Sequence, residues 1–309
     1  MSEVQEAAAF SPGHITAFFE IHDSHPDPAR RGSRGAGLSV DLGAVSHVRV
    51  LRSDEPGIAI MINEEAAEAP VTERAIRALV GRSAVRVEVR TQLHLPVSQG
   101  FGMSAAGALS AALALAKALR LPKSDAVIAA HKAEVESATG LGDVVAAVQG
   151  GVEIRREPGL PPWGYVERVV GEGELVLCVL EGPLETRAVL GDAEARKRIQ
   201  KAGKAALVAF SERPTLPNLF RVGKQFSLDS GLATEKVLRA IRAAELAEGL
   251  ASQSMLGHSV FAYGTKLDEL EAALKKHGQT WRARVEPTGA RVLAIERAGE
   301  PPSGSPSTP

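Results

Sequence analysis

A glycine-rich segment at residues 96–107 carries the groups best suited to binding an anion. It reads Pro-Val-Ser-Gln-Gly-Phe-Gly-Met-Ser-Ala-Ala-Gly and leads from a predicted strand into a predicted helix. Gly100 and Gly102 allow the backbone to adopt positive φ and to approach a ligand closely. The free N–H groups at the start of the helix favour a negative charge. Ser104 can cap this helix, or it can direct its hydroxyl towards a phosphate or a phosphate-bound Mg²⁺.

Three interpretations of this loop compete. Gly100-x-Gly102-x-x-Ala105 matches the dinucleotide-binding fingerprint, which needs an acidic residue at the end of a second strand, whereas Asp125 stands at a predicted helix start. A Walker A loop is excluded because no Gly-Lys-Ser/Thr follows the glycines. A tight strand-to-helix turn that binds nothing remains open. The loop alone therefore does not decide between a ligand and a turn.

Two carboxylates follow the loop in an order that suits phosphoryl transfer. Glu134 lies in a predicted helix, and Asp143 follows a Gly-Leu-Gly turn. Transfer from a nucleotide needs Mg²⁺ held by carboxylates and a group that orients or deprotonates the attacking hydroxyl. Glu134 and Asp143 can divide these roles, and His131 shares the helix face of Glu134. The alternatives are a solvated helix surface for Glu134 and a helix N-cap for Asp143.

The elements that must position these residues are predicted from hydrophobic period and from Gly and Pro. Strands are expected at residues 7–10, 37–42, 47–51, 57–62, 85–94, 151–156, 165–170 and 175–180, near 260, and at 281–285 and 291–296. Helices are expected at residues 72–80, 104–119, 124–137 with Ser124 as N-cap, 143–149, 193–210, 216–226, 234–248 and 267–277. This order predicts an α/β (α+β) chain with a mixed unit at residues 1–180, a helix-rich unit at 181–298 and a disordered tail at 299–309.

Composition excludes several classes of function. The 309 residues contain 36 Lys and Arg against 37 Asp and Glu, a formal net charge of −1, so no nucleic acid or anionic membrane is expected as a partner. The N-terminus is acidic, and the longest apolar stretch is shorter than the ~18 residues of a membrane span. We therefore expect a cytoplasmic protein. The single cysteine, Cys178, is expected to be a core residue of a strand.

The loop at residues 96–106 resembles the Pro-x-x-x-Gly-Leu-Gly-Ser-Ser-Ala motif of the GHMP kinases, the superfamily of galactose, homoserine, mevalonate and phosphomevalonate kinases. Residues 10–20, 32–38, 140–143 and 150–155 resemble the archaeal pantoate kinase family within it. The resemblance extends to about residue 296. It implies a two-domain α/β fold with ATP and substrate in the cleft between the domains.

The resemblance also implies roles for individual residues. Asp143 would be the base that activates the substrate hydroxyl, and Ser104 and Glu134 would lie at the Mg²⁺. The residues that would wrap the ATP phosphates are Gly100, Phe101, Gly102, Met103, Ser104, Ala105 and Ala106, and those that would meet pantoate are Ser33, His131 and Arg155. The implied reaction is ATP-dependent phosphorylation of pantoate to 4-phosphopantoate in archaeal coenzyme A biosynthesis. We also expect a homodimer.

The sequence departs from the superfamily pattern near both ends. The third motif, at residues 254–259, offers only Gly257, and residues 1–50 contain no Lys, so a cation beside Asp143 must be Arg34, His14 or a group from elsewhere. The rival functions are another kinase of the superfamily, of mevalonate, homoserine or shikimate type, and a ligand sensor without catalysis. A transition-metal site would have to use His14, His22, Asp23, His25 and Asp27, whose spacing fits no common ligand pattern.

Overall fold

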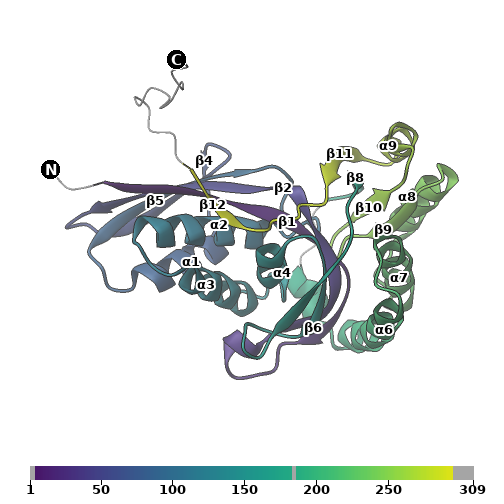
Figure 1. Cartoon of the computed structure of the whole chain (residues 1–309), viewed down its shortest axis with the longest axis horizontal. Helices are drawn as coiled ribbons and strands as arrows, with labels where there is room; N and C mark the ends of the chain where they lie inside the picture. Colours follow the sequence, from purple (N-terminus) through teal and green to yellow (C-terminus); the bar gives the residue numbers. More distant parts are fainter. Residues whose placement is uncertain (1–3, 183–185, 295–309) are drawn as a thin grey trace, which may run out of the picture.

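The computed structural model describes residues 4–182 and 186–294. Within these residues, an eight-stranded sheet has the order β12-β1-β2-β5-β3-β4, with β6 and β7 branching from β2, and a four-stranded sheet has the order β11-β8-β10-β9. Helices pack on both sheets (Figure 1). The predicted α/β fold class is confirmed.

The hairpin of β1 (Gln5–His22) and β2 (Gly32–Arg52) is the central feature of the first sheet. The sequence prediction divided it into three short strands because Ser-Pro-Gly and several glycines interrupt the pattern. The structure carries β1 across Pro12 and Gly13 by a shift in register. Strand β2 pairs with β5 (Val85–Leu93) along its second half and with β6 (Val152–Glu157) along its first half, which causes the sheet to branch.

The remaining strands complete the two sheets. In the first sheet they are β3 (Gly57–Ile62), β4 (Glu65–Ala66), β7 (Tyr165–Val169) and β12 (Arg291–Leu293). The second sheet contains β8 (Glu174–Val179), β9 (Leu250–Gln253), β10 (Ser259–Tyr263) and β11 (Gln279–Arg284). Cys178 is buried in β8, as predicted.

Four helices lie on one face of the first sheet (Figure 1): α1 (Pro70–Val80), α2 (Met103–Ala118), α3 (Lys123–Glu136) and α4 (Asp143–Gln149). Helix α2 is buried almost all round because alanine lets β1, β2, α1 and α3 approach it closely. The predicted N-cap at Ser124 is wrong, since α3 begins one residue earlier, after Pro122, and has no side-chain cap.

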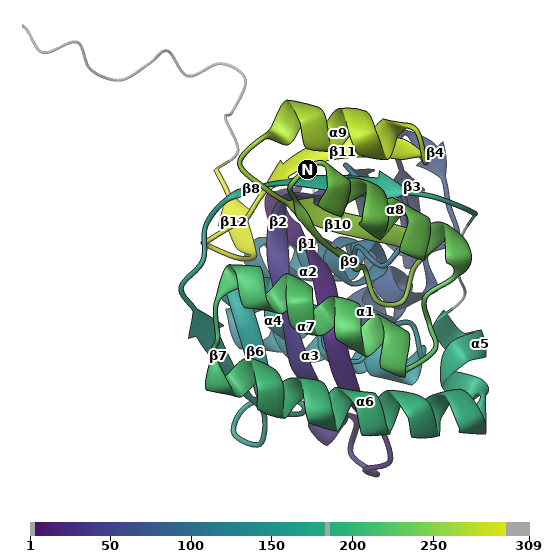
Figure 2. The ribbon, with the colours of Figure 1, turned by 90° about the vertical axis from the view of Figure 1, so that its right-hand side faces the viewer.

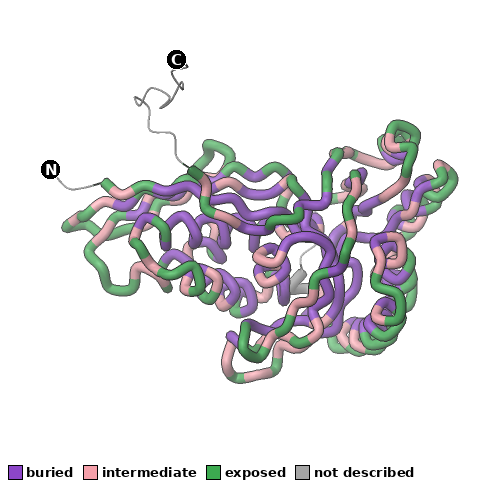
Figure 3. Tube along the Cα trace, viewed as in Figure 1, coloured by how far each residue is buried: buried purple, intermediate pink, exposed green. Residues whose placement is uncertain are grey.

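Among the described residues, the other helices are α5 (Thr186–Gly191), α6 (Ala193–Glu212), α7 (Leu216–Asp229), α8 (Glu235–Leu246) and α9 (Leu267–Lys275), and a 3-10 turn spans Pro28–Arg30. Helices α6 and α7 lie across the hairpin (Figure 2), while α8 and α9 pack on the second sheet. The ring of Phe18 in β1 lies 5.7 Å from that of Phe210 in α6, and Phe19 lies 5.7 Å from Phe226 in α7. The hairpin and the helices of the C-terminal part therefore share one hydrophobic core. Its residues belong to the buried segments in the middle of the molecule (Figure 3).

The division of the chain at residue 180 stays a prediction. The strand pairings assign β8 to the second sheet, and they return β12 to the first sheet, where it pairs with β1. A division by sheet therefore places β8 with the C-terminal part. The predicted disordered tail lies outside the described residues. No helix among the described residues is long and apolar enough to cross a membrane.

Candidate active site

A cavity of about 480 Å³ opens between the start of α2, the turn before α4 and the hairpin. Its wall brings together the glycine loop with Glu134, Asp143 and Ser33. The C-terminal part contributes Leu190, Met255 and Leu256. The sequence elements chosen for their chemistry therefore meet at one cleft, to which both parts of the chain contribute.

The glycine loop adopts the backbone that its glycines predict. Gly100 has φ of 77° and Gly102 has φ of 63°, and Gly102 is the N-cap of α2. Ser104 caps nothing: its side chain is exposed at the cavity and has no hydrogen-bond partner among the described residues. Five of the seven predicted ATP-binding residues line the cavity, whereas Phe101 and Ala106 are buried and anchor the loop in the core.

The segment at residues 254–259 holds the loop from the other side. The Ser259 hydroxyl donates to the carbonyl of Gln99 at 2.5 Å. A Cβ at Gly257 would overlap that carbonyl and lie 2.7 Å from the nitrogen of Gly100, so only glycine allows this close packing. The weak third motif therefore positions the glycine loop even with one glycine.

Glu134 is buried rather than solvated, with 1% of its surface exposed. Its carboxylate accepts hydrogen bonds from the backbone N–H groups of Gly142 at 3.3 Å, Asp143 at 3.0 Å and Val144 at 3.3 Å. These donors stand at the start of α4, so Glu134 satisfies the N-terminus of that helix. Asp143 is consequently released from the capping role that the sequence left open.

The surroundings of Glu134 suit a divalent cation. Burial first, and then the charge of Asp143, raise the pKa of Glu134 to about 8, against the three N–H bonds that lower this pKa. A bound cation would offset both unfavourable effects. Glu134 and the unpartnered Ser104 hydroxyl are oxygen donors on one cavity wall, and such donors, with phosphate and water, are what Mg²⁺ prefers. The residues present therefore fit Mg²⁺.

The predicted alternative of a transition-metal site is not supported. The described residues contain no group of three or more His, Cys, Asp or Glu side chains arranged for a metal ion. His14 faces Asp143, Asp23 pairs with Arg196, and Asp27 caps the turn at Pro28–Arg30. These three residues thus serve different partners.

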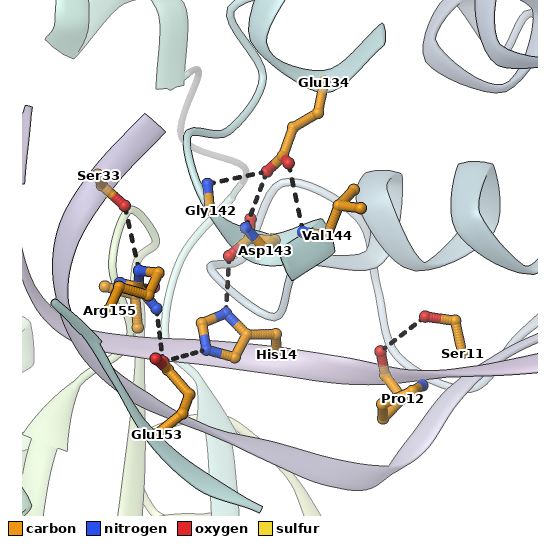
Figure 4. Close-up of polar contacts among 11 residues, drawn as sticks. Ser11, Pro12, His14, Ser33, Glu134, Gly142, Asp143, Val144, Glu153 and Arg155 are labelled. Atoms are coloured by element: carbon orange, nitrogen blue, oxygen red, sulfur yellow. Dashed lines mark hydrogen bonds and ion pairs between the residues drawn. The ribbon is translucent and has the colours of Figure 1, made fainter. Parts of the chain in front are cut away.

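Asp143 belongs to a chain of polar groups that runs behind the cavity (Figure 4). Its Oδ1 lies 2.8 Å from Nδ1 of His14, and Nε2 of His14 lies 3.0 Å from Oε1 of Glu153. The same Glu153 oxygen accepts a hydrogen bond from Nη1 of Arg155 at 2.5 Å. His14 lies just after the register shift in β1, and its backbone N–H donates a hydrogen bond to the Phe101 carbonyl at 3.0 Å.

The predicted substrate residues are placed in two ways. Ser33 lines the cavity, and its hydroxyl accepts a hydrogen bond from Nε of Arg155 at 3.2 Å. Arg155 is 1% exposed and lies beneath the wall, where Nη2 also donates to the Thr16 hydroxyl at 3.3 Å. Its donors therefore reach Ser33, Thr16 and Glu153 rather than the open cavity.

His131 also lies behind the cavity. It is fully buried, its Nε2 donates to the Arg31 carbonyl at 3.1 Å, and its Nδ1 has no partner among the described residues. Burial lowers the pKa of His131 to about 4, so the ring is neutral near pH 7. The structure therefore gives His131 the task of holding the segment around Arg31.

Comparison with known proteins agrees with this geometry. The GHMP kinases N terminal domain matches residues 70–151. A pantoate kinase of Methanospirillum hungatei is 30% identical over 96% of this chain and 99% of its own length. A pantoate kinase of Thermococcus kodakarensis is 35% identical over 82% of this chain and 86% of its own length. The chain belongs to the pantoate kinase family. It is therefore an ATP-dependent small-molecule kinase with the GHMP kinase fold, as the motifs predicted.

The fold of this chain is also similar to that of a solved structure. A protein described as a phosphotransferase related to the coenzyme A biosynthesis pathway is 29% identical, with a TM-score of 0.82 over 93% of this chain and 98% of its own. The similarity therefore covers both the N-terminal and the C-terminal part of the chain.

Sequence reasoning missed two members of the site. Thr16 lines the cavity, and Glu153 links His14 to Arg155. A signal for Glu153 existed, because Val-Glu-Ile-Arg places two opposite charges on one face of a strand. That pattern usually marks a solvated face, and only the tertiary structure shows that this face is buried.

Proposed function

We propose that the protein transfers the γ-phosphoryl group of ATP to the primary hydroxyl of pantoate and forms 4-phosphopantoate for coenzyme A synthesis. One observation carries this proposal: in a chain related to pantoate kinases over nearly their whole length, the Asp143 carboxylate faces the same cavity as the glycine loop. This shared cavity supports assigning a general base and phosphate-binding groups to one reaction.

Asp143 is the group that takes the proton. His14 occupies its Oδ1, which leaves Oδ2 for the attacking hydroxyl. As the substrate oxygen forms its bond to the γ-phosphorus, the bond to the β-phosphate oxygen breaks, ADP leaves and the hydroxyl proton moves to Oδ2. The N–H groups at the start of α2 stabilise charge on the phosphates.

Glu134 and Ser104 are the residues that would hold Mg²⁺. When bound, the ion would neutralise negative charge that develops on the phosphates during transfer. Glu134 is fixed for this task by its three backbone N–H donors, and Ser104 by its place in the first turn of α2.

Ser33 and Thr16 offer hydroxyl groups to pantoate at the cavity wall. Arg155 supports both hydroxyls from below, so its charge reaches the substrate carboxylate through them rather than by a direct bidentate grip. His131 fixes the segment that precedes Ser33. The expected homodimer stays a prediction.

The test is an ATP-consumption assay that compares pantoate with mevalonate, homoserine, shikimate and galactose. Turnover with pantoate and negligible turnover with the others is the expected result. Turnover of any of the other four with pantoate inert would refute the proposal. Binding of Mg-ATP without turnover of any acceptor would instead favour a sensor.

A further inference from the structure

We propose that Glu153 is a positioning residue that keeps His14 as an imidazolium, so that His14 serves as the cation holding Asp143. This inference rests on the proposed function, in which Asp143 is the base. It assigns a task to a side chain that lies behind the cavity wall and does not line it.

The hydrogen-bond chemistry of His14 carries the argument. Its Nδ1 faces Oδ1 of Asp143 at 2.8 Å and its Nε2 faces Oε1 of Glu153 at 3.0 Å (Figure 4). An ionised carboxylate only accepts hydrogen bonds, and a neutral imidazole has a single N–H. A neutral ring would therefore hold a lone pair against one of the two carboxylates. The doubly protonated ring donates to both.

The charges around His14 come closer to balance when the ring is charged. The charged groups that face it are Asp143 of α4 and Glu153 of β6, with Arg155 on the far side of Glu153 and Glu134 of α3 beside Asp143. His14 and Glu153 are 1% and 0% exposed, so water does not compensate them. Burial lowers the pKa of His14, but hydrogen bonds and charge from Asp143 and Glu153 outweigh burial and leave that pKa raised.

Gly37 leaves space for the contact between His14 and Glu153. Glu153 is the cross-strand partner of Gly37 in β2, and a Cβ at Gly37 would lie 2.7 Å from Nε2 of His14 and 3.1 Å from Oε1 of Glu153. Any side chain there would push the ring away from the carboxylate. The absence of a side chain at Gly37 therefore lets the Glu153 carboxylate reach His14.

This arrangement explains how Asp143 is oriented. A charge-assisted hydrogen bond from an imidazolium is about twice as strong as one from a neutral ring. It fixes Oδ1 and leaves Oδ2 for the attacking hydroxyl. Because Glu153 also accepts from Arg155, it ties the orientation of the base to the residue that supports Ser33 and Thr16.

The direct test is the protonation state of His14 in the wild-type protein, measured by NMR of ¹⁵N-labelled histidine rings. We expect both ring nitrogens of His14 to carry protons at about pH 8, above the ordinary histidine pKa of about 6.5. A neutral ring at that pH would overturn the inference. This measurement needs no variant to fold and no turnover, so it stands apart from the proposed function.

A second test uses Glu153→Gln, with Glu157→Gln as the matched control on an exposed position of the same strand. With pantoate, we expect Glu153→Gln to lower kcat by about tenfold near pH 8.5 and by less than about threefold near pH 6, where the ring stays protonated. The control should match the wild type at both values. An equal loss at both pH values would show a merely structural role and refute the inference. If the wild type turns over none of the acceptors, the proposed function fails instead.

Discussion

Gly140→Ala is a sharp test of the Glu134 site, because it adds one methyl group at a defined place. A Cβ at Gly140 would overlap Oε1 of Glu134 and lie 3.2 Å from its Cδ and 3.0 Å from Oδ2 of Asp143. Ordinary contacts begin at 3.4 Å, so both carboxylates must move. Gly140 has no positive φ, so the effect is steric rather than a backbone strain.

The expected magnitude follows from the displacement. Oε1 is the atom that accepts from Gly142 and Asp143, and it must move by about 1 Å, a misplacement that can cost ~10²-fold in rate. Losing these two buried bonds should also destabilise the protein by roughly 2 to 4 kcal/mol. We therefore expect kcat to fall about a hundredfold and the Mg²⁺ concentration for half-maximal rate to rise.

The assay is steady-state turnover with pantoate at several Mg²⁺ concentrations, with thermal unfolding to confirm the fold. Gly57→Ala is the matched control, because nothing lies within 4 Å of its added Cβ. If the methyl group acts through Glu134, Gly140→Ala should have little further effect in a Glu134→Ala background. A folded Gly140→Ala protein with wild-type kcat and Mg²⁺ dependence would refute the reasoning, and so would fully additive losses.

Three further predictions address other parts of the site. Asp143→Asn keeps the size of the side chain and removes the base, so kcat should fall by ~10²–10⁴-fold with the fold retained; a loss below tenfold would contradict its role. Ser259→Ala removes the hydroxyl that holds the Gln99 carbonyl, so KM for ATP should rise more than KM for pantoate, as initial rates at varied ATP would show. Because burial lowers the pKa of His131 to about 4, the unfolded chain takes up this proton at higher pH than the folded protein does. The contribution of His131 to the free energy of unfolding is therefore complete above the ordinary pKa of about 6.5 and is lost as the pH falls from there through about 4. Relative to His131→Gln, the wild type should therefore lose about 3 kcal/mol of unfolding free energy across that window, as denaturant titrations would measure, and parallel pH profiles would contradict this.

The glycine loop, Glu134 and Asp143 could be singled out because each has a local signal in the sequence. The glycines mark the strand-to-helix turn, and the Gly-Leu-Gly turn separates Glu134 from Asp143. Helix α4 and strand β3 were predicted at their observed bounds for the same reason. What local patterns could not give is the continuation of β1 through Pro12 and Gly13, because pairing with β2 overrides the tendency of these residues to end a strand.

The burial of the charged residues could not be predicted from the sequence either. Glu134 was open to interpretation as a solvated side chain, yet it is buried against the backbone of a helix nine residues further along the chain. Arg155 was expected in the cleft, yet it lies beneath the wall because Glu153 and two hydroxyls take its donors. Burial of a polar group depends on partners that are distant in sequence, and spacing along one strand does not reveal them.

The acidic lining of the cleft gives the buried Arg155 and His14 their importance. Glu68, Glu134 and Asp143 line the described cavity, and no Lys or Arg among the described residues does so. ATP and pantoate are both anions, so in the proposed function their binding would draw on backbone N–H groups, on the dipole of α2 and on a divalent cation at Glu134. Arg155 and His14 supply positive charge from behind the wall, each paired with Glu153. A cleft built in this way can hold two anionic substrates without a free basic side chain that would pair with Asp143 and compete for the substrate hydroxyl.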